Sequence, residues 1–170
     1  ARFSYALLLP PMRADLQWSY ALSGLMNAAN AAGYLLGALS LPALTARLGA
    51  RRLMLMGSAL AALFLALHGV LRSDAALMLM RLASGVASGF VFATGGLLAA
   101  RLATSAAPQG VSAGLLLGVY YGGTGWGIVV CALAVAAFTE GWLGAAGAVG
   151  SLGGWPAAWV ALGALAAIRP

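Results

Sequence analysis

Long apolar stretches alternate with short polar gaps along the whole chain. A helix that crosses the hydrocarbon core of a bilayer needs about 20 mostly apolar residues, so the pattern predicts about six transmembrane helices with short connections. Pro10 and Pro11 are expected to end the first helix, and Pro42 to begin the exit from the second. The expected spans are residues 1–12 (partial), 20–41, 53–71, 75–98, 111–138 and 155–168 (partial). The pattern therefore predicts an all-α fold, a polytopic transmembrane helical bundle.

The composition supports a membrane protein. Hydrophobic residues make up 63% of the 170 residues and charged residues only 7%, whereas soluble domains have about 45–50% apolar residues. The chain contains 24 glycines, and small residues let helix backbones approach closely in lipid. This favours a helical bundle over a barrel, with the lipid bilayer as its solvent.

The charged residues predict the orientation of the chain. The gaps after the second and fourth spans contain arginines and no acid, whereas those after the first, third and fifth together hold Arg13, Asp15, Arg72, Asp74 and Glu140. Arginine-rich connections lie in the cytoplasm, so we expect the gaps after the second and fourth spans there, and Trp18, Trp142 and Trp155 near the opposite face. The net charge of +6 does not predict nucleic-acid binding, because the arginines are scattered between apolar runs. The arginines of the cytoplasmic gaps are Arg47, Arg51, Arg52 and Arg101.

Polar residues inside the second span share one helix face. Ser23, Asn27, Asn30 and Tyr34 recur at steps of four, three and four residues. Such a stripe must face protein or water rather than lipid. Two interpretations remain open: hydrogen bonds between helices, or the lining of a substrate cavity.

Two arginines are expected deep within spans. Arg81 lies about 9 Å along the fourth helix, and Arg2 about 16 Å from the outer end of the first. A buried arginine is costly, which usually indicates function; the alternative is a structural arginine bonded to backbone carbonyl groups. If both side chains face a cavity, its field is positive and favours an anionic or carboxylate-bearing substrate.

Glycines at four-residue spacing predict close helix contacts. They occur on the second, fourth and fifth spans, where we expect smooth faces for helix packing. The glycines concerned are Gly33, Gly37, Gly85, Gly89, Gly114, Gly118 and Gly122.

Little in the chain points to catalysis. It has one histidine, one cysteine and no acid within a span, so we expect no catalytic residue, metal site or cofactor. His68 is expected at the outer end of the third span, in a packing or interfacial role rather than in proton transfer. Two other interpretations are a small structural or assembly membrane protein and, less favoured, an intramembrane enzyme.

Several motifs resemble those of the major facilitator superfamily (MFS). The gap between the second and third spans has the arginines and glycine of the superfamily's loop signature at Arg47, Gly49, Arg51 and Arg52, with Ala46 in place of its usual acid. The segment 81–89 is similar to the fourth-helix arginine motif. The segments 2–5, 9–12 and 155–159 resemble the YbfB/YjiJ-type MFS subfamily of bacterial transporters.

This resemblance implies a fold and a function. The chain would be a single transmembrane domain, the N-terminal six-helix half of a twelve-helix secondary transporter, cut at both ends, with the C-terminal half of the same polypeptide as its partner. It would lie in the bacterial cytoplasmic (inner) membrane and move a small molecule by alternating access. The candidate substrate contacts are Arg2, Asn27, Asn30, Arg81, Tyr120, Tyr121 and Thr124.

Overall fold

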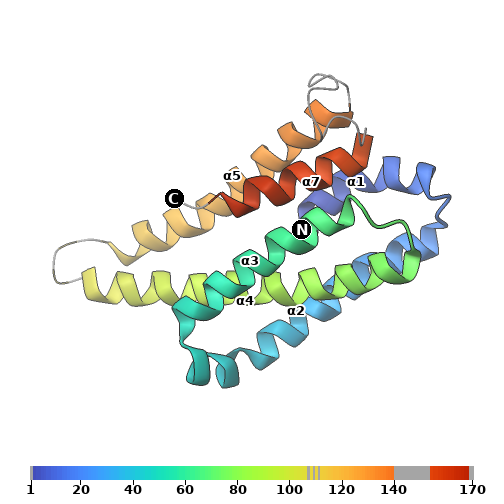
Figure 1. Ribbon diagram of the computed structural model, residues 1–170. Coiled ribbons are helices and arrows are strands. Elements are labelled where there is room, and N and C mark those ends of the chain that lie inside the picture. Colours follow the sequence, from blue (N-terminus) through green and yellow to red (C-terminus); the bar gives the residue numbers. More distant parts are fainter. Residues whose placement is uncertain (1, 107, 109, 111, 140–153, 169–170) are drawn as a thin grey trace.

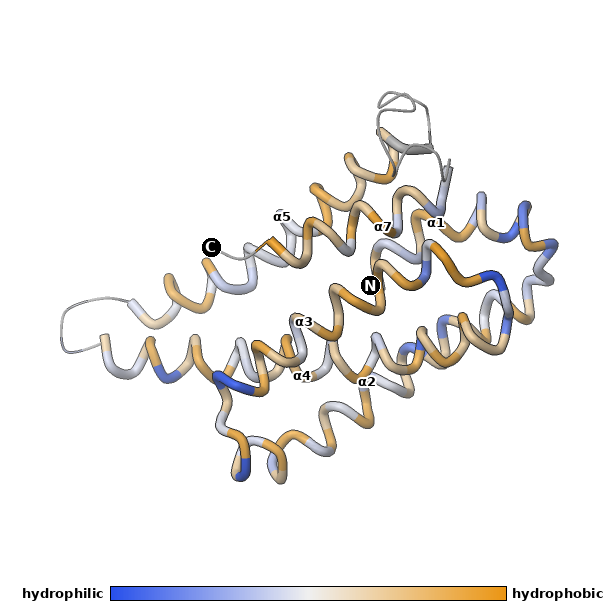
Figure 2. The backbone as a smooth tube through the Cα atoms, viewed as in Figure 1, coloured by the Kyte–Doolittle hydropathy of each residue, from blue (hydrophilic) through white to orange (hydrophobic). Residues whose placement is uncertain are grey.

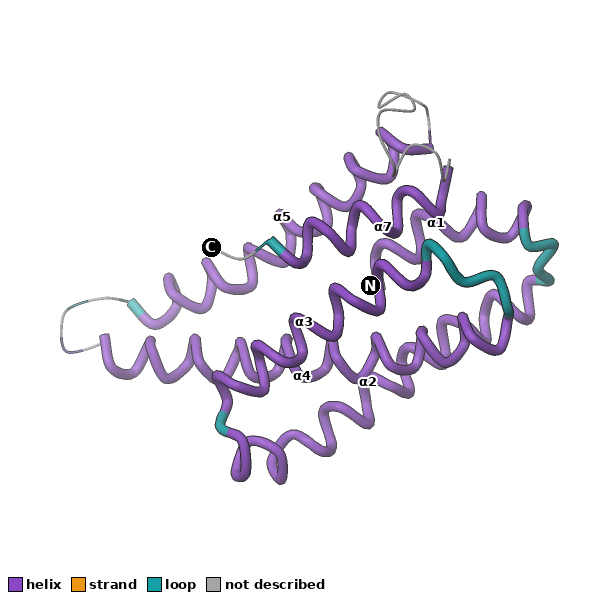
Figure 3. The backbone as a smooth tube through the Cα atoms, viewed as in Figure 1, coloured by secondary structure: helices purple, strands orange, loops and turns teal. Residues whose placement is uncertain are grey.

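The protein folds into a bundle of helices that run in alternating directions (Figure 1). The computed structural model describes residues 2–106, 108, 110, 112–139 and 154–168, and this part of the chain contains no β-strand. The first four helices are joined by short connections (Figure 3). The helices are α1 (Arg2–Asp15), α2 (Tyr20–Leu48), α3 (Ala50–His68), α4 (Asp74–Ala106), α5 (Ala113–Thr139) and α7 (Gly154–Ala167).

Four of these helices, α2, α3, α4 and α5, are long and apolar enough to cross a membrane. The other two, α1 and α7, have 14 residues each. Hydrophobic residues predominate along the helices, and most of the strongly hydrophilic residues lie toward the ends of the bundle (Figure 2). The all-α membrane bundle expected from the hydropathy pattern is thus confirmed.

The helix ends differ from those expected. Pro10 and Pro11 do not end the first helix but lie inside α1, which continues to Asp15. Pro42 likewise lies inside α2, which ends at Leu48. Neighbouring helices and local backbone adjustments tolerate proline in membrane helices. The backbone hydrogen bonds also continue beyond the apolar stretch, so hydropathy marks the membrane boundary rather than the helix end.

Glycines bring α2 and α4 into close parallel contact. A Cβ atom built on Gly33 would overlap the carbonyl group of Leu82, and one built on Gly85 would overlap that of Asn30. One turn further along, Gly37 and Gly89 face the α4 and α2 backbones in the same way. The two small-xxx-small pairs therefore pack reciprocally, as such motifs do between membrane helices.

The helices α3 and α7 form a second close contact. A Cβ atom on Gly163 would lie 2.7 Å from the backbone nitrogen of Ala66. Near the end of α3, the His68 ring stacks on Trp159 with centroids 4.7 Å apart, and both side chains are buried. His68 therefore has the packing environment expected of it.

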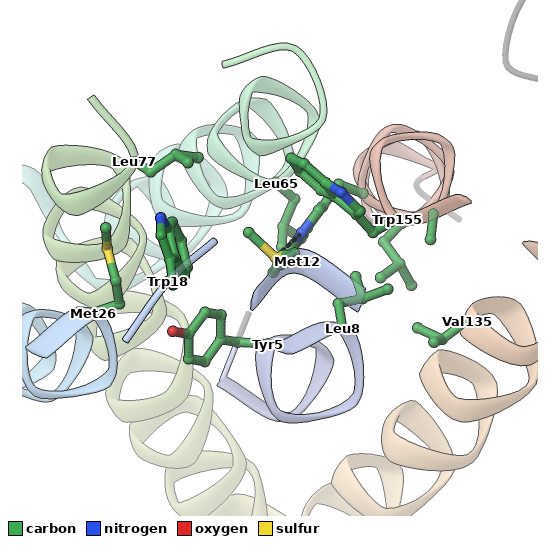
Figure 4. Packing of buried hydrophobic residues seen from close by; sticks show 12 residues of the cluster. Tyr5, Leu8, Met12, Trp18, Met26, Leu65, Leu77, Val135 and Trp155 are labelled. Atoms are coloured by element: carbon green, nitrogen blue, oxygen red, sulfur yellow. Dashed lines mark hydrogen bonds between the residues drawn. The ribbon is translucent and has the colours of Figure 1, made fainter. Parts of the chain in front are cut away.

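The apolar core surrounds α1. Tyr5, Leu8 and Met12 are buried on this helix, and side chains from α3, α4, α5 and α7 pack around them (Figure 4). Trp18 and Trp155 are also buried, and their indole nitrogens donate hydrogen bonds to Asp74 and Asp15 at the end of the bundle. Asp15 thus connects α1 to α7, and Asp74 connects α4 to the turn that follows α1. Trp142 lies outside the described residues.

Candidate functional site

The buried Arg81 is the main polar feature between the helices. Its side chain is only 1% exposed. The guanidinium carbon lies 3.9 Å from the ring centroid of Tyr5 on α1, and Nε donates a hydrogen bond to the Met26 carbonyl oxygen on α2 at 3.3 Å. An aromatic face and a carbonyl oxygen both stabilise a cation that is shielded from water.

Hydrogen bonds from α2 extend this contact. The Asn30 amide donates to the Arg81 carbonyl oxygen at 2.9 Å and to the Ser84 hydroxyl at 3.2 Å. The Tyr5 hydroxyl donates to the Ser23 carbonyl oxygen at 3.0 Å. We call this group the Arg81 node; it joins α1, α2 and α4 and consists of Tyr5, Ser23, Met26, Asn30, Arg81 and Ser84.

A second group is aromatic and lies further along α4, between α2 and α5. Phe92 contacts Tyr34, Tyr120 and Tyr121, with ring centroids 5.9–6.5 Å apart. Tyr120 and Tyr121 meet edge to face at 5.0 Å, and the Tyr120 hydroxyl donates to the Phe92 carbonyl oxygen at 2.8 Å. We call these four residues the aromatic cluster. Tyr121 is half exposed and Phe92 is 40% exposed, so the cluster presents ring surface outside the bundle.

The structure divides the predicted substrate contacts. Asn30 and Arg81 meet in the Arg81 node, and Tyr120 and Tyr121 meet in the aromatic cluster. Asn27 and Thr124 are exposed and belong to neither group. The Arg2 side chain lies outside the described part of the structure. The candidates that meet one another thus form two clusters that lie one after the other along α4, and their contact with a substrate stays a prediction.

The predicted packing glycines also divide. Gly33, Gly37, Gly85 and Gly89 lie at the contact between α2 and α4. On α5, a Cβ atom built on Gly118 or Gly122 would meet none of the described residues within 4 Å, and one built on Gly114 would lie near the Ser112 hydroxyl. A packing role for these three glycines stays a prediction.

The predicted loop signature lies at the turn between α2 and α3. Gly49 has a φ of +78°, ends α2 with a hydrogen bond from its N–H to the Thr45 carbonyl oxygen, and directly precedes α3. Glycine adopts this left-handed backbone at no steric cost. Arg47, Arg51 and Arg52 are exposed on either side of the turn.

Sequence reasoning did not identify Tyr5 as a partner of Arg81. The signal available was the spacing of Tyr5, Leu8 and Met12, which share one face of a helix. That face packs into the core. The facing partner depends on the tertiary arrangement, which periodicity does not reveal.

A shallow apolar groove lies elsewhere, between α2 and the first turns of α4. None of the predicted substrate contacts whose side chains the structure describes lines it, and it is open to the surroundings. Its lining residues are Ala29, Asp74, Ala75, Met78, Leu79 and Leu82. Among the residues that the structure describes, no group of histidine, cysteine or acidic side chains is placed to hold a metal ion.

This fold and these contacts define a class of protein, a multi-pass helical membrane protein with a buried arginine between its helices. Such an arrangement is typical of transporters. A family model described as uncharacterised MFS-type transporter YbfB matches residues 1–169. The chain therefore belongs to this family of MFS-type transporters, as its motifs suggested. No curated protein and no solved structure matches the chain.

Proposed function

We propose that this chain is the N-terminal half of a secondary transporter that moves a small molecule by alternating access across the bacterial cytoplasmic membrane. Membership of the MFS-type family supports a transporter. The burial of Arg81 between α1, α2 and α4 is the single observation that supports a substrate site at this position. A charge held inside a membrane bundle usually marks a substrate or ion pathway.

The proposed substrate bears a carboxylate or another anionic group. Arg81 is its proposed partner, and Tyr5 covers the guanidinium in the conformation described here. Alternating access requires helices to shift relative to one another. A shift of α1 away from α4 would uncover the guanidinium and present it to an anion, while return of Tyr5 would release the anion.

The aromatic cluster would supply the apolar part of the same pathway. Its rings lie roughly 16 Å from Arg81 along α4, because Phe92 follows Arg81 by eleven residues. Tyr121 and Phe92 are the exposed members of the cluster. They would contact the substrate as it moves along the face of α4 and α5.

Uptake into proteoliposomes tests this proposal. The full-length transporter is reconstituted, and uptake of radiolabelled benzoate, lactate and succinate is compared with that of tetraphenylphosphonium, a permanent cation. We expect uptake of at least one carboxylate, with a loss of at least tenfold in Arg81→Met. Arg13→Met, in the last turn of α1, is the matched control and should keep its rate within twofold.

The opposite selectivity would refute the anionic substrate. That result is transport of tetraphenylphosphonium at an undiminished rate in the Arg81→Ala and Arg2→Ala variants.

A further inference from the structure

The arginines at the two ends of the bundle differ in whether they contact partners within the chain. At the end where α1 meets α2 and α3 meets α4, the arginines have partners within the chain. Arg72 lies 3.2 Å from an Asp15 carboxylate oxygen and stacks over the Trp155 ring at 4.6 Å. Arg13 lies over the Tyr20 ring at 3.8 Å. The positive charge of this end is therefore largely compensated.

The opposite end has four arginines without such partners. They are exposed, and none of their guanidinium groups has an ion pair, hydrogen bond or aromatic contact with a residue that the structure describes. We call this group the arginine end. Its members are Arg47 in the last turn of α2, Arg51 and Arg52 in the first turn of α3, and Arg101 on α4.

Packing between α3 and α4 brings these residues to one level. A Cβ atom on Gly57 of α3 would contact Ala87, Phe90 and Val91 of α4, and the two helices run in opposite directions. Helical rise then places Ala50 about 10 Å from this contact and Arg101 about 15 Å from it, both toward the same end. The one-residue turn at Gly49 adds Arg47 to the group.

The stability of α3 does not explain its two arginines. The first turn of α3 has no acidic residue, and its N-cap, Gly49, provides no side-chain hydrogen bond. The positive end of the helix dipole disfavours Arg51 and Arg52 at this position. The N-terminus of a helix and guanidinium groups favour the same kind of partner, an anion.

We propose that the arginine end binds the phosphate of an anionic phospholipid headgroup, of the phosphatidylglycerol class. The four arginines flank long apolar helices at one end of the bundle, where headgroup phosphates lie. Leu39 on α2 and Leu55 and Met56 on α3 are exposed close to the turn and would contact the acyl chains. The chain has no lysine, and arginine binds phosphate with two parallel hydrogen bonds.

Native mass spectrometry of the full-length protein tests this proposal. Dioleoylphosphatidylglycerol or dioleoylphosphatidylcholine is titrated into the delipidated protein in detergent. Juxtamembrane arginines each contribute roughly fivefold to binding of an anionic surface. We therefore expect the variant Arg51→Gln/Arg52→Gln to bind phosphatidylglycerol at least tenfold more weakly, with unchanged binding of phosphatidylcholine.

Two further variants serve as controls. Arg13→Gln/Arg72→Gln removes the same charge from the opposite end and should change the affinity for phosphatidylglycerol by less than twofold. Arg51→Lys/Arg52→Lys keeps the charge but loses the two parallel hydrogen bonds, and its affinity should lie between those of the unmodified protein and of Arg51→Gln/Arg52→Gln. Equal weakening by the two glutamine variants would overturn the proposal, because it would indicate a response to net charge alone.

Competition with a soluble anion identifies the source of the phosphate. Inorganic phosphate is added at 10 mM, which is roughly a physiological concentration. If the acyl chains contribute to the binding of phosphatidylglycerol, the bound lipid should stay in place. Displacement of the lipid by inorganic phosphate would overturn the lipid assignment in favour of a soluble phosphate ligand.

Discussion

At the scale of single residues, Tyr5 has two separable contacts in the Arg81 node. Its ring lies over the Arg81 guanidinium, and its hydroxyl donates to the Ser23 carbonyl oxygen. A desolvated cation–π contact contributes about 2 kcal/mol, whereas a hydrogen bond between membrane helices contributes about 0.6 kcal/mol on average. The ring should therefore matter more than the hydroxyl.

Two substitutions at Tyr5 separate these contacts. Tyr5→Phe keeps the ring and should lower the free energy of unfolding by about 0.6 kcal/mol. Tyr5→Leu removes the ring over a buried charge and should lower it by about 2 kcal/mol or more. Unfolding of the purified protein in mixed micelles, followed by far-ultraviolet circular dichroism, measures both. Equal losses in the two variants would contradict the cation–π contact.

At the scale of helices, the contact between α2 and α4 depends on the absence of side chains. Gly85→Ala places a methyl group against the Asn30 carbonyl group, and Gly37→Ala places one 2.6 Å from the Val86 carbonyl oxygen. The backbones must then separate, which also weakens the hydrogen bonds of Asn30. We expect a loss of about 1–3 kcal/mol for each, as overpacking usually gives.

Gly118→Ala is the matched control for these variants. A Cβ atom at Gly118 meets nothing within 4 Å among the described residues, and alanine favours a helix over glycine by about 1 kcal/mol. Its stability should stay equal or rise in the same unfolding assay. A loss as large as that of Gly85→Ala would show that the α5 glycines pack in the complete protein.

The sequence predicted the positions of the helices well, but it predicted their ends and their mutual contacts less well. Hydropathy identified each described helix because lipid requires long apolar runs. It did not identify the continuation of α1 past Pro10 and Pro11 or of α2 past Pro42, which depends on backbone hydrogen bonds. Spacing placed Asn30 and Arg81 on polar faces, but the contact of Arg81 with Tyr5 required the arrangement of α1 against α4.

At the scale of the whole molecule, the charges at the two ends indicate how the bundle sits in the membrane. At one end, Asp15 pairs with Arg72, and Asp15 and Asp74 each accept a hydrogen bond from an indole nitrogen. The opposite end is the arginine end. Arginine-rich connections stay in the cytoplasm. We therefore propose that the turn at Gly49 faces the cytoplasm and the turn at Ser73 faces the opposite side.

Cysteine labelling in intact cells is the most direct test of this membrane-spanning arrangement. Single cysteines are introduced as Ser73→Cys and as Ala46→Cys beside the arginine end, in a full-length background without cysteine, including Cys131→Ser. We predict that a membrane-impermeant maleimide labels Ser73→Cys in intact cells and labels Ala46→Cys only after permeabilisation. Labelling of both positions from the same side of the intact membrane would contradict the account.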